Sequence, residues 1–398
     1  MGAVANASFG ATNLSAYAHS YDFRLVSNFT YFLEDPIDGD EFVQIDERVV
    51  LGGAASHRFD FDPVRLTVGA DLRHDAIERV GLFESVDGMA VSPIRTDSID
   101  QTGIGLYASA EVALTDRVRA IGGLRYDRLS YSVDADLAAN SGDGSDDLFA
   151  PKASLAWRVL DELELYANYG QSFHSNDARG AAIAIDPTSG DPADPVPLLA
   201  RAEGAELGAR VERGTLSASL VGYWLELDSE LVFVGDGGAT EPNDGSRRYG
   251  IEADLFWQAT DEIVLDAAYS TTDARFIGPP DGEDDIPGAV PTVVSAGIRY
   301  QPIQPLSFTA RLRHFSSAPL IEDGSVTSDP TTLVNLGAYY ELGAITLGAE
   351  LFNAFDSEDA DITYFYESRL ADEPVGVEDR HFHPVEPRQL RFSIEARF

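Results

Sequence analysis

Residues 387–398 read Pro-Arg-Gln-Leu-Arg-Phe-Ser-Ile-Glu-Ala-Arg-Phe and form a two-faced segment. From Leu390 onward, apolar residues alternate with polar or charged ones as far as Phe398. Successive side chains of a β-strand point to opposite faces, so this alternation predicts a strand with one apolar and one charged face. Such a strand suits a soluble sheet, whose apolar face meets a core. It equally suits an outer-membrane barrel, whose apolar face meets lipid and whose charged face lines a wet lumen.

The same alternation recurs along the whole chain and predicts an all-β protein with about 17 strands. Clear examples are residues 64–72, 104–113, 163–169, 251–259 and 334–340. Few places support the period of a helix, and no stretch approaches the roughly 20 apolar residues that a membrane-spanning helix needs. The regular repetition favours one large β architecture over several small domains.

The connections between the predicted strands are of two classes, short and long, which alternate along the chain. Short ones, such as residues 115–116 and 161–162, suit tight hairpins. Long ones rich in Gly, Pro and Asp lie between them, at residues 34–40, 77–97, 132–147, 174–200, 234–244, 276–290, 316–329 and 356–386. This order predicts a transmembrane antiparallel β-barrel with short periplasmic turns and long extracellular loops, because outer-membrane barrels have that layout.

Charge and composition exclude several classes of function. The chain carries 28 Lys and Arg against 67 Asp and Glu, a formal net charge of -39, which would repel nucleic acid. Cysteine is absent, so disulfides, thiolate metal sites and cysteine nucleophiles are excluded. No nucleophile elbow and no paired-histidine motif occur, so we expect neither enzymatic activity nor a cofactor.

Five segments, taken in order, resemble TonB-dependent outer-membrane receptors. Residues 163–180, Leu-Glu-Leu-Tyr-Ala-Asn-Tyr-Gly-Gln-Ser-Phe-His-Ser-Asn-Asp-Ala-Arg-Gly, and residues 204–210 are similar to the middle of such a barrel. Residues 247–253 resemble the recurrent strand that follows a long loop in that family, and residues 351–356 the end of its penultimate strand. Residues 391–398 resemble its terminal signature. The resemblance therefore spans nearly the whole chain.

The resemblance implies a 22-stranded barrel, plugged by an N-terminal domain that engages TonB and preceded by a signal peptide. We expect residues 1–398 to be the barrel portion alone, beginning at about the sixth strand, with no plug, no TonB-engaging segment and no signal peptide. The implied location is the bacterial cell outer membrane. The implied function is uptake of a scarce nutrient such as a ferric siderophore, with outer-membrane lipid, a small ligand such as an iron chelate, and TonB through a plug as partners.

Three other interpretations stay open at this point. A barrel without a plug could act as a passive porin-like channel, or the chain could be a receptor fragment without function of its own. A soluble β-protein, such as an adhesin or a carbohydrate binder, is the third, and it predicts solubility without detergent.

One group of candidate ligand-binding residues opens the long loop that follows residues 163–173. His174, Asn176, Asp177 and Arg179 offer hydrogen-bond donors and acceptors that could hold a polar ligand or close against a plug. The alternative is a structural cap at the end of the strand.

A second group lies in a later strand. Arg311 and Arg313 could contact an anionic ligand such as a ferric chelate, or they could pair with acidic residues of the lumen. The acidic residues 143–147 and 281–285 carry oxygen ligands of the kind calcium prefers, but neither has EF-hand spacing, so solvated loops are the favoured interpretation and we predict no metal site.

Overall fold

The computed structural model describes residues 1–230, 232–234, 239–241, 244–280 and 282–397. Within these residues the chain is built almost entirely of β-strands, as predicted. No helix in this part of the chain is long and apolar enough to cross a membrane.

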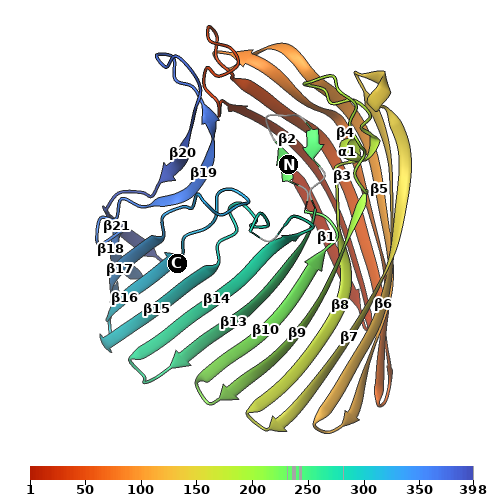
Figure 1. Ribbon diagram of the computed structural model, residues 1–398. Helices are drawn as coiled ribbons and strands as arrows, with labels where there is room; N and C mark the ends of the chain where they lie inside the picture. Colours follow the sequence, from red (N-terminus) through yellow and green to blue (C-terminus); the bar gives the residue numbers. More distant parts are fainter. Residues whose placement is uncertain (231, 235–238, 242–243, 281, 398) are drawn as a thin grey trace.

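Seventeen strands form one continuous, curved antiparallel sheet, which confirms the predicted all-β barrel fold and the predicted strand number (Figure 1). Each strand pairs with its neighbours in sequence, except that β10 pairs with β13, and β18 with β21, each across an inserted hairpin. The strands of the sheet are β1 (Gly2–Phe9), β2 (Thr12–Ser27), β3 (Phe42–Phe61), β4 (Val64–Val86), β5 (Met89–Thr115), β6 (Val118–Ala135), β7 (Gly142–Leu160), β8 (Leu163–Ser175), β9 (Leu199–Arg213), β10 (Leu216–Leu227), β13 (Gly245–Gln258), β14 (Ile263–Ile277), β15 (Thr292–Ile303), β16 (Leu306–Phe315), β17 (Thr331–Leu342), β18 (Ile345–Phe352) and β21 (Gln389–Ala396).

Smaller elements lie in the long connections. The hairpins β11–β12 (Val232–Val234 and Ala239–Glu241) and β19–β20 (Ala360–Ser368 and Val377–Pro384) form separate two-stranded sheets. The loop after β8 holds the five-residue helix α1 (Ala178–Ala182), and a 3₁₀ turn, η1 (Ala138–Asn140), follows β6.

The short turns lie at one end of the sheet and the long connections at the other (Figure 1). Gly214 and Gly343 occupy short turns with φ of 59° and 64°, a conformation that glycine adopts without steric strain. β1 and β21 are the two edges of the sheet, and no pairing joins them among the described residues.

The loop between β2 and β3 and the β19–β20 hairpin, which lie near the two edges of the sheet, contact each other at the end of the long connections. In the β2–β3 loop, the amide of Phe32 donates to Arg369 O at 3.0 Å, and the amide of Arg369 donates to Thr30 O at 3.0 Å. The Arg369 guanidinium also donates to Phe32 O at 3.0 Å. We call this contact between the β2–β3 loop and the β19–β20 hairpin the rim bridge (Figure 1).

Two predicted long loops are wrong. Most of residues 77–97 belongs to β4 and β5, which continue to a two-residue turn at Asp87 and Gly88, and residues 132–147 are largely β6 and β7. The register of β4 and β5 shifts three times in this region, so the alternation that marks a strand in the sequence is broken there. The extensions are stabilised by an apolar cluster, since Ile77, Val80 and Ile99 pack with Val133 and Ala178.

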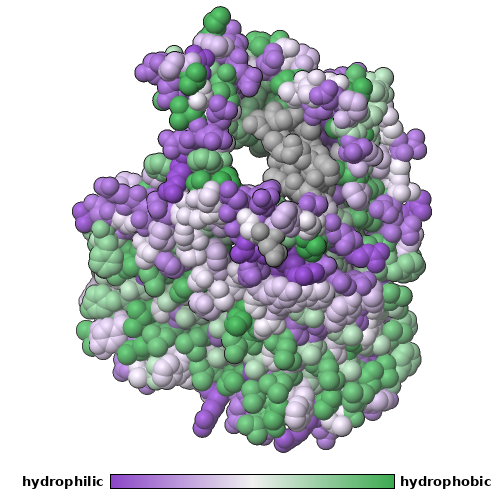
Figure 2. Space-filling view, viewed as in Figure 1, coloured by the Kyte–Doolittle hydropathy of each residue, from purple (hydrophilic) through white to green (hydrophobic). Residues whose placement is uncertain are grey.

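The sheet exposes apolar side chains on its outer face. Leu207 is 68% exposed, and Leu106, Leu124, Leu220 and Ile251 are each about half exposed. Figure 2 shows a largely hydrophobic band over the strands and a hydrophilic surface above it, around the long connections. This distribution is that of a barrel wall facing lipid, with the long connections outside the hydrocarbon.

The inner face carries tyrosines that lie over glycines of the neighbouring strand. In each case the two residues are directly paired, and a Cβ atom on the glycine would overlap the tyrosine ring. The pairs are Tyr17 with Gly52, Tyr107 with Gly69, Tyr166 with Gly208, and Tyr223 with Gly250. Tyr166 therefore does not belong to an interfacial aromatic girdle, for which its place near a strand end makes it a candidate, because it packs flat against the lumen wall.

Substituting Gly208→Ala should destabilise the wall. The added methyl group has no room beside Tyr166, so the ring must swing into the lumen or the strands must separate. Overpacking of this kind costs about 1–3 kcal/mol. Thermal unfolding of the detergent-solubilised protein, followed by circular dichroism, measures the loss.

Gly222→Ala on the adjacent strand is the matched control, because nothing lies within 4 Å of a Cβ at that position. Its unfolding temperature should equal that of the wild type. Equal unfolding temperatures for the two variants would refute the steric role of Gly208.

Candidate functional site

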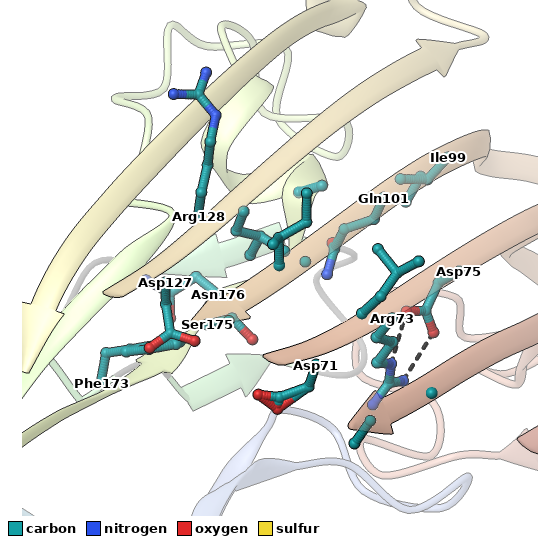
Figure 3. A pocket seen from close by; sticks show the side chains of 18 of the residues that line it. Asp71, Arg73, Asp75, Ile99, Gln101, Asp127, Arg128, Phe173, Ser175 and Asn176 are labelled. Carbon is teal, nitrogen blue, oxygen red and sulfur yellow. Dashed lines mark hydrogen bonds and ion pairs between the residues drawn. The ribbon is translucent and has the colours of Figure 1, made fainter. Parts of the chain in front are cut away.

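A cavity of about 680 Å³ is hollowed into the inner wall at the outer half of the sheet. Strands β2 to β6, the end of β8 and the residues before α1 line it (Figure 3). Tyr17 and Gln101 contribute from strands, and Phe173, Asn176 and Asp177 contribute from the end of β8 and the loop that follows. The cavity therefore joins the rigid wall to one of the long connections.

Paired charges two residues apart dominate the wall of the cavity. Arg73 donates two hydrogen bonds to Asp75, at 2.7 and 2.8 Å, and the two side chains point toward one another in Figure 3. Arg125 pairs in the same way with Asp127, at 2.6 Å. Residues two apart on a strand share a face, so the spacing itself brings each guanidinium to its carboxylate.

Arg125 also reaches across a strand. Its Nη1 lies 2.7 Å from Asp71 Oδ2, although β6 and β4 are separated by β5. Gly105 of β5 lies beneath this contact, and a Cβ there would collide with both side chains. Because Gly105 has no side chain, Arg125 of β6 can form an ion pair with Asp71 of β4 across β5.

Two of the four predicted loop residues lie at the edge of this cavity. Asn176 and Asp177 line it, whereas His174 and Arg179 do not belong to its lining. Asn176 is buried and donates its side-chain amide to Pro197 O, and His174 Nε2 lies 2.8 Å from Ser229 O. The contact of Asn176 with Pro197 fixes one part of the long loop to another, whereas that of His174 joins the end of β8 to the segment that follows β10.

Asp177 and Arg179 form an ion pair at the start of α1. The pair distance is 2.7 Å, and Asp177 also accepts from the Arg179 amide at 2.8 Å as the N-cap of the helix. Burial opposes the charged form of Asp177, but the Arg179 guanidinium outweighs it, so the pKa of this carboxyl lies below its ordinary value. Burial likewise opposes the charge of Arg179, and Asp177 nevertheless raises its pKa.

The second predicted group lies elsewhere in the sheet. Arg311 of β16 pairs with Asp266 of β14 at 2.9 Å, again across a glycine, Gly297. This pair lines a separate cavity of about 440 Å³. Arg313 lies two residues further along the same strand face. The six predicted residues are thus divided between two places on the wall.

The acidic segments differ from simple loops. Residues 143–147 lie within β7. In the second acidic segment, residues 281–285, Asp284 and Asp285 lie 3.3 and 2.5 Å from the Arg275 guanidinium. Asp281 falls outside the described residues. Among the residues that the structure describes, no group of three or more acidic or histidine side chains is arranged to hold a metal ion.

Sequence reasoning missed the charges that line the cavity. The available signal was the spacing of two between Arg and Asp, which occurs at Arg73 and Asp75 and again at Arg125 and Asp127. The bridge from Arg125 to Asp71 left no such signal, because it depends on the register of three strands.

Comparison with known proteins gives a consistent result. The sequence matches the family described as TonB dependent receptor-like, beta-barrel over residues 4–354. Among solved structures, the ferric citrate transporter FecA in its unliganded form is similar, with 15% identity, a TM-score of 0.75, and coverage of 97% of this chain and 59% of that one. The ferric yersiniabactin uptake receptor FyuA from Yersinia pestis has 12% identity, a TM-score of 0.74, and coverage of 99% and 60%.

The copper transporter OprC is a third similar structure, with 16% identity, a TM-score of 0.73, and coverage of 97% of this chain and 62% of that one. At such identities the likeness concerns the fold alone. The chain spans about three fifths of the length of these three structures.

Acid should release the loop that carries Asp177. Because the folded-state pKa of Asp177 is lowered, its stabilising effect is present above the unfolded pKa of about 3.9 and is lost as pH falls through the lower folded value. The amide of Val196, which donates to Gly180 O at 3.0 Å, reports the docked loop. Its hydrogen-exchange protection should hold from pH 8 to 5 and fall below about pH 4.

Substituting Asp177→Asn should reduce this protection at neutral pH by about 10- to 150-fold, since a charge-assisted bond is worth about 1.5–3 kcal/mol. Asp191→Asn, an exposed change in the same loop, is the control and should leave protection unchanged. The same loss of protection in both variants would contradict the assigned role of Asp177.

Proposed function

The chain belongs to the TonB-dependent receptor-like β-barrel family, and we propose that it forms the membrane-spanning wall of a receptor that takes up a scarce small nutrient, such as a ferric siderophore. Barrels of this family are bacterial outer-membrane proteins, and this chain is one of them. Many structural relatives are receptors or transporters of iron chelates or metals.

One observation carries the proposal: a polar cavity in the lumen wall of a lipid-facing barrel, at the end where the long connections lie. Its volume of about 680 Å³ falls in the range of small-molecule binding sites. Backbone pairing makes the wall rigid, while the loop after β8 brings side chains to the cavity from the outer side. A rigid wall meeting a surface loop is a common arrangement for recognition.

The proposal gives each candidate residue a role. Asn176 and Asp177 contact the ligand at the cavity edge, while His174 and Arg179 hold the loop that presents them. Arg311 and Arg313 supply positive charge further around the lumen. No catalytic role is assigned, because the proposed function is binding and passage of a ligand and not its conversion.

The proposed receptor works with a plug domain and with TonB. Residues 1–398 act in it as barrel only, and energy from TonB reaches the ligand through a plug that lies outside these residues. The proposal is supported by the family match, which covers residues 4–354 with a barrel description.

Uptake of iron-55 tests the proposal. The gene is expressed in its natural context, in a Gram-negative strain deleted for its own iron-chelate receptors, with TonB present or absent. We expect saturable accumulation from at least one ferric chelate that disappears without TonB. Non-saturable accumulation that persists without TonB would instead favour a passive porin-like channel, and no accumulation would favour a fragment without function.

Substituting Gln101→Ala should reduce uptake roughly 2- to 10-fold, because the Gln101 amide points into the cavity and one hydrogen bond is worth about 0.5–1.5 kcal/mol. Gln258→Ala, at the periplasmic end of β13, is the control. If both variants transport like the wild type, this cavity is not the ligand site.

A further inference from the structure

The cavity holds arginines, but it is not a positively charged site. Three arginines and four aspartates face it: Arg48, Arg73, Arg125, Asp71, Asp75, Asp127 and Asp177. Arg128 also borders the cavity, but it lies on the face of β6 opposite to Arg125 and Asp127. Its guanidinium donates to Ser145 at 2.8 Å and points away from the other lining side chains in Figure 3. The side chains facing the cavity therefore carry no excess of positive charge.

Two of the carboxylates, Asp75 and Asp127, are buried more deeply than the guanidiniums that neutralise them. Asp75 is 3% exposed while its partner Arg73 is 57% exposed. Asp127 is 9% exposed, and its partner Arg125 is also held by Asp71. A polyanionic ligand that drew either arginine away would leave a buried carboxylate without its counter-charge, which is strongly unfavourable.

Neutral polar groups meet no such penalty. The exposed part of the Arg73 guanidinium can donate to an uncharged oxygen without leaving Asp75. Asp71, which is 35% exposed, and the Gln101 amide can meet donors of the same ligand. The net charge of -39 on the whole chain adds a long-range repulsion of anions.

We propose that this cavity selects a net-neutral polar ligand and rejects polyanions. The inference rests on the proposed uptake function and narrows its substrate class. For iron chelates, it assigns the cavity to uncharged trihydroxamate complexes, in which three hydroxamate anions balance Fe³⁺, and not to tris-catecholate complexes, which carry three negative charges. The paired Arg and Asp side chains are the specificity-determining groups.

Two probes that differ in charge test the inference. Equilibrium dialysis with iron-55 compares a ferric trihydroxamate with a ferric tris-catecholate on the detergent-solubilised protein. At about 20 mM salt the neutral complex should bind at least tenfold more tightly. The difference should shrink at about 500 mM salt, because salt screens the repulsion of the trianion.

A single charge change then tests the residues. Asp127→Asn keeps the side-chain shape but leaves Arg125 with Asp71 as its carboxylate partner, so the affinity for the trianion, relative to that for the neutral complex, should rise about tenfold. Asp161→Asn is the matched control, since Asp161 faces Arg117 at 3.6 Å in the exposed short turn between β7 and β8, at the opposite end of the sheet from this cavity. Circular dichroism verifies that both variants are folded.

The outcomes separate the inference from the proposed function. Tighter binding of the trianion by the wild-type protein, binding of neither complex, or an equal shift in Asp161→Asn would each overturn the inference. TonB-dependent uptake of the trianionic chelate alone would also overturn it, while leaving the receptor function in place. A preference for the neutral complex without any TonB-dependent uptake would support the inference about the cavity and contradict the proposed receptor function.

Discussion

The pairing of backbone amides and carbonyls between strands is the constraint on which this molecule depends. In hydrocarbon an unpaired backbone group has no water to replace its partner, so a spanning sheet must keep its register without interruption. Strand β10 meets this demand over its full length, paired to β9 and β13 from Leu216 to Leu227 with no shift. With the register held, alternate side chains are assigned to lipid or lumen, and the wall acquires its apolar and charged faces.

Glycine gives the inner face its particular form. Opposite Tyr166, the absent Cβ of Gly208 leaves room for an aromatic ring to lie flat, so a large side chain takes up little of the lumen. Beneath the contact of Arg125 with Asp71, the absent Cβ of Gly105 lets two charges meet over an intervening strand. The absence of a Cβ atom therefore lets the Tyr166 ring lie flat without narrowing the lumen, and it lets β4 and β6 be joined by an ion pair across β5.

Alternation predicted the strands well wherever lipid enforces it, as in residues 64–72 and 163–169. It failed at residues 77–97, because that part of the β4–β5 hairpin packs against a loop and tolerates shifts of register. Asp177 was predicted as a candidate from its place in the loop, but its pairing with Arg179 and its border with the cavity required the folded chain. The contact of Arg125 with Asp71 could not be predicted from spacing, because it joins strands whose relative register the sequence does not state.

The rim bridge has a consequence for the order of assembly. The Arg369 guanidinium and Phe32 are 337 residues apart in sequence, so in a free chain their encounter would require closing a very long loop. Once the strands between them have paired, the curvature of the wall has already brought the two segments together, and most of that entropy has been lost. The bridge is therefore a late event in folding. Its presence distinguishes a chain in which the β2–β3 loop and the β19–β20 hairpin have both been placed from one that is still being inserted.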